Sequence, residues 1–165
     1  MKIFKVIFLI PLIFSLANSA YADEALTLSV KRLKMETALR IAQAAIIQCR
    51  KEGVQIAVTV VDRSGHAQVV LRDVLAMDIT LPISKQKAHT AMAFNSELSQ
   101  IEDRFTKPFQ VAKLDGLVIS AGGIPINIGG SILGGIGVSG APSGVTDEKC
   151  AKAGLAAVSE DLEME

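Results

Sequence analysis

Residues 55–73, QIAVTVVDRSGHAQVVLRD, contain two apolar runs separated by four residues that are typical of a turn. Residues 55–61 are rich in β-branched side chains, which indicates a strand buried on both faces. Residues 62–65 have turn chemistry, because glycine adopts positive φ without steric cost. Residues 66–73 then alternate between apolar and polar side chains, which point to opposite faces of a strand. The stretch therefore predicts an antiparallel hairpin with one polar-lined face.

Helices are expected on both sides of this hairpin. Residues 27–49 place apolar side chains at the spacing of an amphipathic helix. Thr27 or Ser29 can cap its start, and Gly53 is a natural left-handed stop. Later helices are predicted at residues 80–94, 96–105 and from about 146 to 162, with a break at Pro108.

The glycine-rich part of the chain is expected to form strands. Nine of the thirteen glycines fall within residues 122–144. Residues 117–121, 124–126 and 131–139 have strand character, and residues 127–130 suit a hairpin turn. Because the short strand connections are hairpins, we expect an antiparallel sheet with helices packed against it, an α+β domain.

The first 22 residues have the pattern of an export signal. Lys2 and Lys5 give a basic start, an apolar run follows, and AYA at residues 20–22 matches the sequence that signal peptidase reads. The apolar run is too short for a spanning helix, which needs about 20 residues. We therefore expect residues 1–22 to be cleaved. Residues 23–165 would then form a single periplasmic or secreted domain without stable membrane insertion.

The two cysteines would then lie in an oxidising compartment, where disulfides persist. Cys49 and Cys150 show neither a metal-ligand spacing nor a C-x-x-C pattern. The sequence leaves two alternatives open, which are a structural disulfide between the two cysteines and a pair of buried thiols. Cys49 ends the first predicted helix and Cys150 begins the last, so antiparallel packing of these helices would bring the two together.

Charge and aromatic content argue against nucleic acid as a partner. The 17 basic and 17 acidic residues balance, and removal of Lys2 and Lys5 leaves a net charge of −2. Such a balance gives no electrostatic case for nucleic acid or an anionic membrane. The mature chain would keep three phenylalanines and no tyrosine or tryptophan, whereas single-strand binding depends on aromatic stacking.

No nucleotide-binding or hydrolase motif fits its context. GGIG at residues 134–137 lacks the lysine and the strand-to-helix placement of a phosphate loop, so close packing is favoured, with ligand approach at Gly122-Gly123 as the alternative. Two histidines alone cannot complete a zinc site. His66 is expected to be exposed on the hairpin. His89 is either a surface or interface residue or a polar pocket group, such as an axial iron ligand.

Two basic residues are candidates for binding an anion. Arg72 with Lys87 could hold a carboxylate, because a guanidinium binds it through two hydrogen bonds. The alternative is ordinary pairing with acids such as Asp73 and Asp78. Arg72 lies roughly 20 Å along its strand from His66, so these two cannot hold one small group.

Several motifs in order resemble the GlcG/HbpS family of haem-binding, or haem-degrading, domains. The resemblance covers nearly all of residues 26–158. It is carried by VTVVDRSGH at 58–66, Arg72, KAHTA at 87–91, GGIP at 122–125, GGIGVSG at 134–140, Asp147-Glu148 and AGLAA at 153–157.

The resemblance implies a profilin-like fold, a five-stranded antiparallel sheet flanked by helices, assembled into homo-oligomers. It also implies a small-molecule ligand, with haem bound by several members. The family's recurrent polar positions fall on Arg72, Lys87 and Thr90, with the Gly122-Gly123 bend nearby. A haem would lie near this helix, with His89 on the iron and Arg72 or Lys87 on a propionate.

The rim of the implied pocket departs from the family. Residues 73–78, DVLAMD, replace a short Met-Asp-Gly-Ala-like segment, and residues 95–98 replace a Gly-x-Pro-Thr-like turn. His89 stands where tyrosine or arginine is frequent. Because the rim is altered, haem specificity does not follow from the resemblance alone.

Three functions remain compatible with the sequence. The favoured hypothesis is an exported protein that binds haem or a related tetrapyrrole. The alternatives are a haem-degrading activity and a structural oligomer with a vestigial pocket. The sequence has no recognisable nucleophile–base pair or metal cluster, so binding is favoured over catalysis.

Overall fold

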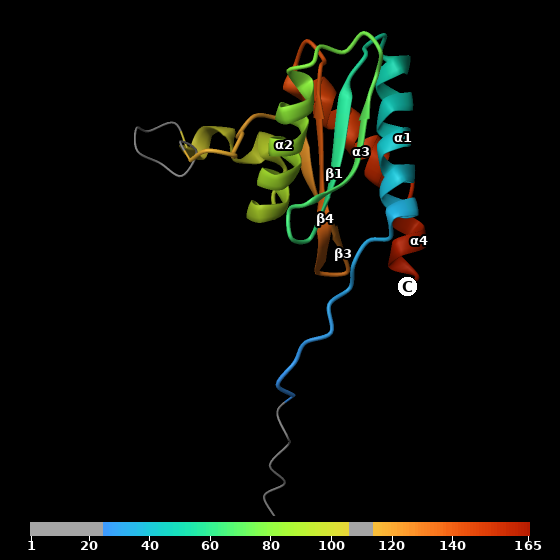
Figure 1. Ribbon diagram of the computed structural model, residues 1–165, viewed down its shortest axis with the longest axis vertical. Coiled ribbons are helices and arrows are strands. Elements are labelled where there is room, and N and C mark those ends of the chain that lie inside the picture. The colour runs from blue at the N-terminus through green and yellow to red at the C-terminus, as the bar shows by residue number, and fades with distance from the viewer. Residues whose placement is uncertain (1–24, 106–113) are drawn as a thin grey trace, which may run out of the picture.

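The computed structural model describes residues 25–105 and 114–165 (Figure 1). The predicted export signal and the break expected at Pro108 lie outside these residues. The described chain forms an antiparallel sheet with helices on both faces, which confirms the α+β class. The elements in chain order are α1 (Met35–Lys51), β1 (Ala57–Asp62), β2 (Ala67–Arg72), α2 (Thr80–Phe94), η1 (Leu98–Gln100), η2 (Glu102–Phe105), β3 (Gly123–Ile128), β4 (Ser131–Ser139), α3 (Gly144–Ala156) and α4 (Ser159–Glu163).

The sheet has the strand order β2-β1-β4-β3, and every neighbouring pair is antiparallel. Both predicted hairpins are present. Strands β1 and β2 pair with Val58 opposite Leu71, and β3 and β4 meet at a turn in which Gly129 and Gly130 both have positive φ. The described residues form four strands, where the family resemblance implied five.

The strand expected at residues 117–121 does not form. Its backbone groups bond to side chains and not to a neighbouring strand. Val118 N donates to Thr90 Oγ1 at 3.1 Å, and Ala121 O accepts from Lys87 Nζ at 2.7 Å. Glu102 accepts from the N–H of Ala121. The side chains of Thr90, Lys87 and Glu102 thus take the place of the hydrogen bonds to a neighbouring strand that the apolar run predicted.

Helix α1 begins at Met35 and not at residue 27. Leu26 and Leu28 are almost fully exposed, so the apolar residues before Leu33 have no surface to pack against and no tertiary support for a helix. Thr27 and Ser29 therefore cap nothing, and the residue before the helix makes no side-chain cap. Gly53 follows the helix with φ +75°, as predicted.

Two other helical predictions need correction. Residues 96–105 form two short 3-10 turns, η1 and η2, and not an α-helix. The last predicted helix is divided into α3 and α4, with Ala157 and Val158 between them. The cap of α3 is Ser143, whose Oγ accepts from Thr146 N at 3.2 Å; it is neither Thr146 nor Asp147.

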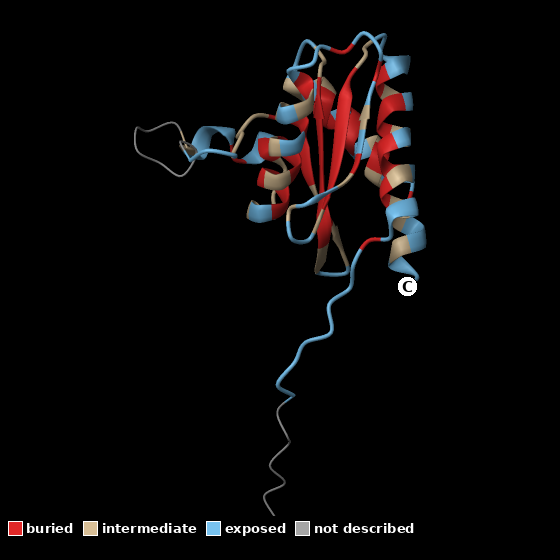
Figure 2. Ribbon diagram, viewed as in Figure 1, coloured by how far each residue is buried: buried red, intermediate tan, exposed pale blue. Residues whose placement is uncertain are grey.

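Strand β4 lies between two helical layers and is buried over most of its length (Figure 2). Ile136 and Val138 join the main core with α1 and α3. On the other face, a Cβ added at Gly137 would lie 2.1 Å from Ser84 O, and one at Gly135 would lie 2.4 Å from Ala88 O. The backbone of α2 therefore rests directly on the sheet, which confirms close packing as the role of the GGIG segment.

A disulfide joins the two helices on the main-core face. Cys49 in α1 and Cys150 in α3 are both fully buried, and their Cα atoms are 5.5 Å apart. The predicted proximity of the two cysteines is therefore confirmed. Among the helices of residues 25–105 and 114–165, none has the length and apolarity needed to cross a membrane.

Candidate functional site

The imidazole of His89 lines an open cleft beside the β1–β2 turn. Asp62 holds this turn, because its Oδ1 accepts from Ser64 N at 2.8 Å and from His66 N at 2.9 Å. Gly65, with φ +82°, leaves room for the ring: a Cβ there would lie 2.5 Å from His89 Cδ2. The cleft has a volume of about 410 Å³ and is called the His89 cleft below. Its lining residues are Gly65, Pro82, Lys85, Gln86, His89 and Gly116.

His89 is half-buried in this cleft. Within the described part of the chain, neither of its ring nitrogens has a hydrogen-bond partner, so the imidazole is available to a ligand. His66 lies on the hairpin with its side chain 83% exposed, as expected.

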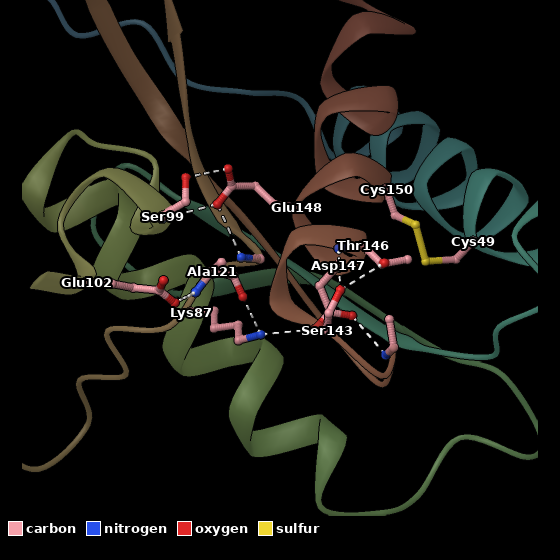
Figure 3. A network of polar contacts seen from close by, with 12 residues as sticks. Cys49, Lys87, Ser99, Glu102, Ala121, Ser143, Thr146, Asp147, Glu148 and Cys150 are labelled. Atoms are coloured by element: carbon pink, nitrogen blue, oxygen red, sulfur yellow. Dashed lines mark hydrogen bonds and ion pairs between the residues drawn. A yellow bond between two sulfur atoms is a disulfide. The ribbon is translucent and has the colours of Figure 1, made fainter.

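Lys87 points into the protein, where it belongs to a buried polar network (Figure 3). Its Nζ donates to Ala121 O at 2.7 Å and to Asp147 Oδ2 at 3.1 Å. The Lys87 and Asp147 side chains are only 5% and 4% exposed. Burial raises the pKa of the Asp147 carboxyl above its usual value, although the Lys87 charge and the Ala141 N–H act in the opposite direction. The ammonium is thus committed to internal partners.

Glu148 forms the other half of this network. It accepts from Ser99 Oγ at 2.7 Å, from Ser99 N at 3.2 Å and from Gly122 N at 3.3 Å. Burial acts to raise the pKa of Glu148, but the hydrogen bonds from Ser99 and Gly122 outweigh it and hold the pKa below its usual value. Glu148 pairs with Ser99 and Gly122, which lie 49 and 26 positions earlier in the chain, and this pairing left no signal in the sequence. The available hint was Asp147 in the first turn of α3, with Glu148 directly after it, since a helix N-terminus favours negative charge.

The other predicted positions around Lys87 hold the backbone in place. Thr90 Oγ1 donates to Gln86 O at 2.7 Å while it accepts from Val118 N. A Cβ at Gly122 would lie 2.7 Å from Lys87 Nζ, and one at Gly123 would lie 2.6 Å from Lys87 O. These contacts fix residues 117–123 against α2. A ligand-binding role for Thr90, Gly122 and Gly123 stays a prediction.

Arg72 is not among the residues that line a cleft with His89 or with Lys87. Its guanidinium donates to Ala76 O, and the residue is among those that line a cleft beside helix α1, whereas Lys87 is among those that line a separate cleft with Asp147. Asp73 pairs with Arg50. The structure thus divides the predicted site residues into three groups: His89 in its cleft, Arg72 near α1, and Lys87 with Thr90, Gly122 and Gly123 in the buried network.

Comparison with known proteins supports one family. The model of the family described as "Haem degrading protein HbpS-like" matches residues 33–156. The crystal structure of a double mutant of HbpS from Streptomyces reticuli is 35% identical, with a TM-score of 0.75, over 79% of this chain and 89% of that chain. An uncharacterised 15.0 kDa protein of Citrobacter freundii, from the dhaT–dhaS intergenic region, is 27% identical over 116 residues, 67% of this chain and 82% of its own.

The same fold occurs in the crystal structure of a PduOC:heme complex. That chain has a TM-score of 0.71 and 24% identity, over 77% of this chain and 95% of its own, and at this identity the likeness concerns the fold alone. The HbpS-like family model, in contrast, extends from just before α1 to the end of α3. The chain therefore belongs to the HbpS-like family of haem-degrading proteins.

Proposed function

We propose that the protein binds haem in the His89 cleft, where an imidazole nitrogen of His89 would bind the iron. The observation that carries the proposal is a half-buried imidazole, without a hydrogen-bond partner in the described residues, that lines an open cleft. Imidazole is a common haem ligand. The family, which is described as haem-degrading, supports the same ligand class.

The cleft residues fit such a group. A volume of about 410 Å³ is within the usual range of ligand pockets, about 300–1,000 Å³. Lys85 lies four residues before His89, so both side chains are on one face of α2. Lys85 is exposed and would meet a propionate, in the role that the sequence assigned to Arg72 or Lys87. Gly65 would hold the imidazole plane, and bound haem would supply a redox-active iron.

His89→Ala should shift the Soret band and weaken haemin binding at least about tenfold, or about 1.4 kcal/mol, because it removes the iron ligand. Titration with haemin, followed by visible absorption, measures both. The matched control is His66→Ala, which removes the only other histidine of the chain and should change neither value. Lys85→Ala should weaken binding without moving the band. An unchanged spectrum and affinity in His89→Ala would remove His89 as the ligand.

Haem degradation is the second candidate function, favoured by the description of the family. The same haemin complex, given ascorbate and oxygen, distinguishes the two. Release of iron and formation of biliverdin would support degradation, whereas a stable spectrum would support binding alone.

We also propose that the protein is exported to a periplasmic or extracellular space. The buried Cys49–Cys150 disulfide supports an oxidising compartment. The purified protein from the periplasm or the medium should begin Asp-Glu-Ala-Leu by N-terminal sequencing, from residue 23. A protein that still begins at Met1 would contradict cleavage.

A further inference from the structure

Residues 25–32 form an arm that the rest of the domain leaves uncovered. Figure 1 shows this segment running away from the sheet and the helices, and it contains no helix or strand. Leu26 and Leu28 are 100% and 89% exposed, and Val30 is 44% exposed. These apolar side chains alternate with polar ones, which is the pattern of a strand with one apolar face. The arm therefore has the sequence of a strand but no sheet to join within its own domain.

Strand β2 offers an open edge to such a segment. In the order β2-β1-β4-β3, β2 has β1 on one side and no strand on the other within the described residues. An edge strand presents a row of unpaired N–H and C=O groups, to which another strand can bond. The opposite edge, β3, contains Pro125, which has no N–H to donate. Strand β2 contains neither proline nor glycine, so its edge is the better acceptor.

A groove lies beside this edge, between β2 and helix α1. It has a volume of about 510 Å³ and is called the edge groove below. Its apolar wall consists of Ile46, which is buried, Leu71, which packs against the main core, and Ile47, which is 52% exposed. A strand added beside β2 would direct every second side chain to the face that Leu71 occupies. The apolar residues of the arm have this spacing.

The arm is anchored at a place from which its own β2 can be reached only by a sharp reversal. Leu33 is buried, and its carbonyl accepts from Gln68 Nε2 at 3.0 Å, near the start of β2. Arg32 pairs with Asp62 at 3.5 Å. From this anchor the arm leads away from the sheet, and residues 30–33, VKRL, contain none of the residue types that favour a tight turn. A second copy of the chain can receive the arm without a reversal.

We propose that residues 25–32 of one copy add as a strand to the open edge of β2 in a second copy, with Leu26, Leu28 and Val30 in the edge groove. The second copy returns its own arm, so the two contacts are equivalent and the dimer is closed. Burial of apolar side chains that are otherwise exposed favours the association. The exchange is independent of haem binding, because α1 and α2 lie on opposite sides of the sheet.

Sedimentation of the purified haem-free protein over a range of concentrations tests the exchange, and a monomer–dimer equilibrium is expected. Leu26→Ser/Leu28→Ser should raise the dissociation constant at least about tenfold, because it removes apolar contacts of both arms. The matched control is Val74→Ser/Leu75→Ser, which changes two adjacent side chains that are 81% and 76% exposed. This control should leave the dissociation constant unchanged.

Three results of the sedimentation experiment would overturn the proposal. The first is a wild-type protein that stays monomeric at every concentration. The second is an equal dissociation constant in Leu26→Ser/Leu28→Ser and the wild type. The third is loss of the dimer in the control variant alone, which would assign the association to residues 74–75.

Mixing two variants tests whether the arm and the edge groove contact each other between copies. Ile47→Lys places a charge in the groove but keeps the arm, whereas Leu26→Ser/Leu28→Ser keeps the groove. One intact contact returns when the two are mixed, so the mixture should associate more tightly than either variant alone. All three side chains are exposed, so the circular dichroism spectra should match that of the wild type. No gain on mixing would contradict the exchange.

Hydrogen exchange distinguishes a shared arm from one that folds back within its own chain. The amides of residues 25–30 and 67–72 should exchange more slowly as the protein concentration rises, because the two segments bond to each other only in the dimer. Exchange rates that do not depend on concentration would mean that the arm is free or lies on its own β2, and would overturn the proposal.

Discussion

Lys87→Met is expected to lower the free energy of unfolding by about 3–5 kcal/mol, because it leaves Asp147 as an uncompensated buried charge. Both side chains are about 5% exposed, and the ammonium also holds Ala121 O. Urea denaturation at pH 7 measures the loss. The control is Lys85→Met, which removes an exposed lysine from the same helix and should change stability by no more than about 0.5 kcal/mol.

The loss in Lys87→Met should depend on pH in a defined direction. Burial raises the pKa of Asp147, so the folded protein binds this proton at a pH where the unfolded chain has released it. Stability therefore falls as pH rises through that window. Removal of Lys87 raises the pKa further, so the difference from the wild type should shrink as pH falls below the raised value. A difference that is constant with pH would show that Asp147 is not the group responsible.

The Cys49→Ala/Cys150→Ala variant is expected to lose up to about 4.7 kcal/mol, the chain-entropy value for a loop of about 100 residues. The two cysteines are 101 positions apart, and the bond limits the unfolded ensemble over most of the domain. Urea denaturation of the variant, beside the wild type with and without reductant, measures the effect. Reduced wild type should resemble the variant, and the variant should not respond to reductant.

A thiol assay checks the premise of this experiment. The unfolded, unreduced wild type should show no free thiol, because its only two cysteines are bonded. Two thiols per chain in protein from an oxidising compartment would contradict the bond.

Local patterns predicted part of the fold well. The alternation in residues 55–73 gave the first hairpin, and residues 80–94 and 131–139 were predicted with the bounds that α2 and β4 have. In these segments, the secondary structure is decided by side-chain periodicity and turn residues, which act over only a few positions of the chain. The apolar run at 117–121 was misread, because its backbone partners are the side chains of Thr90, Lys87 and Glu102, which local propensity does not report.

The site was harder to predict for a similar reason. The sequence indicated His89 as a possible ligand and His66 as exposed, and both placements depend on nearby residues. It offered Lys87 to a ligand, whereas the structure commits its ammonium to Asp147, 60 residues later in the chain. Lysine is almost never fully buried without a partner, so the default expectation for a lysine in such a motif is a free charge.

The contact between α2 and β4 has a mechanical consequence. Where a helix and a sheet are separated by side chains, a small displacement is absorbed as rotamers adjust. At Gly135 and Gly137 no side chain lies between the two elements, since the backbone of α2 contacts the strand directly. A displacement of α2 at His89 is therefore transmitted to the centre of the sheet. Through β4 it also reaches the core beneath α1 and α3. Helix α2 and the sheet should therefore move together, as one rigid body, when a ligand binds.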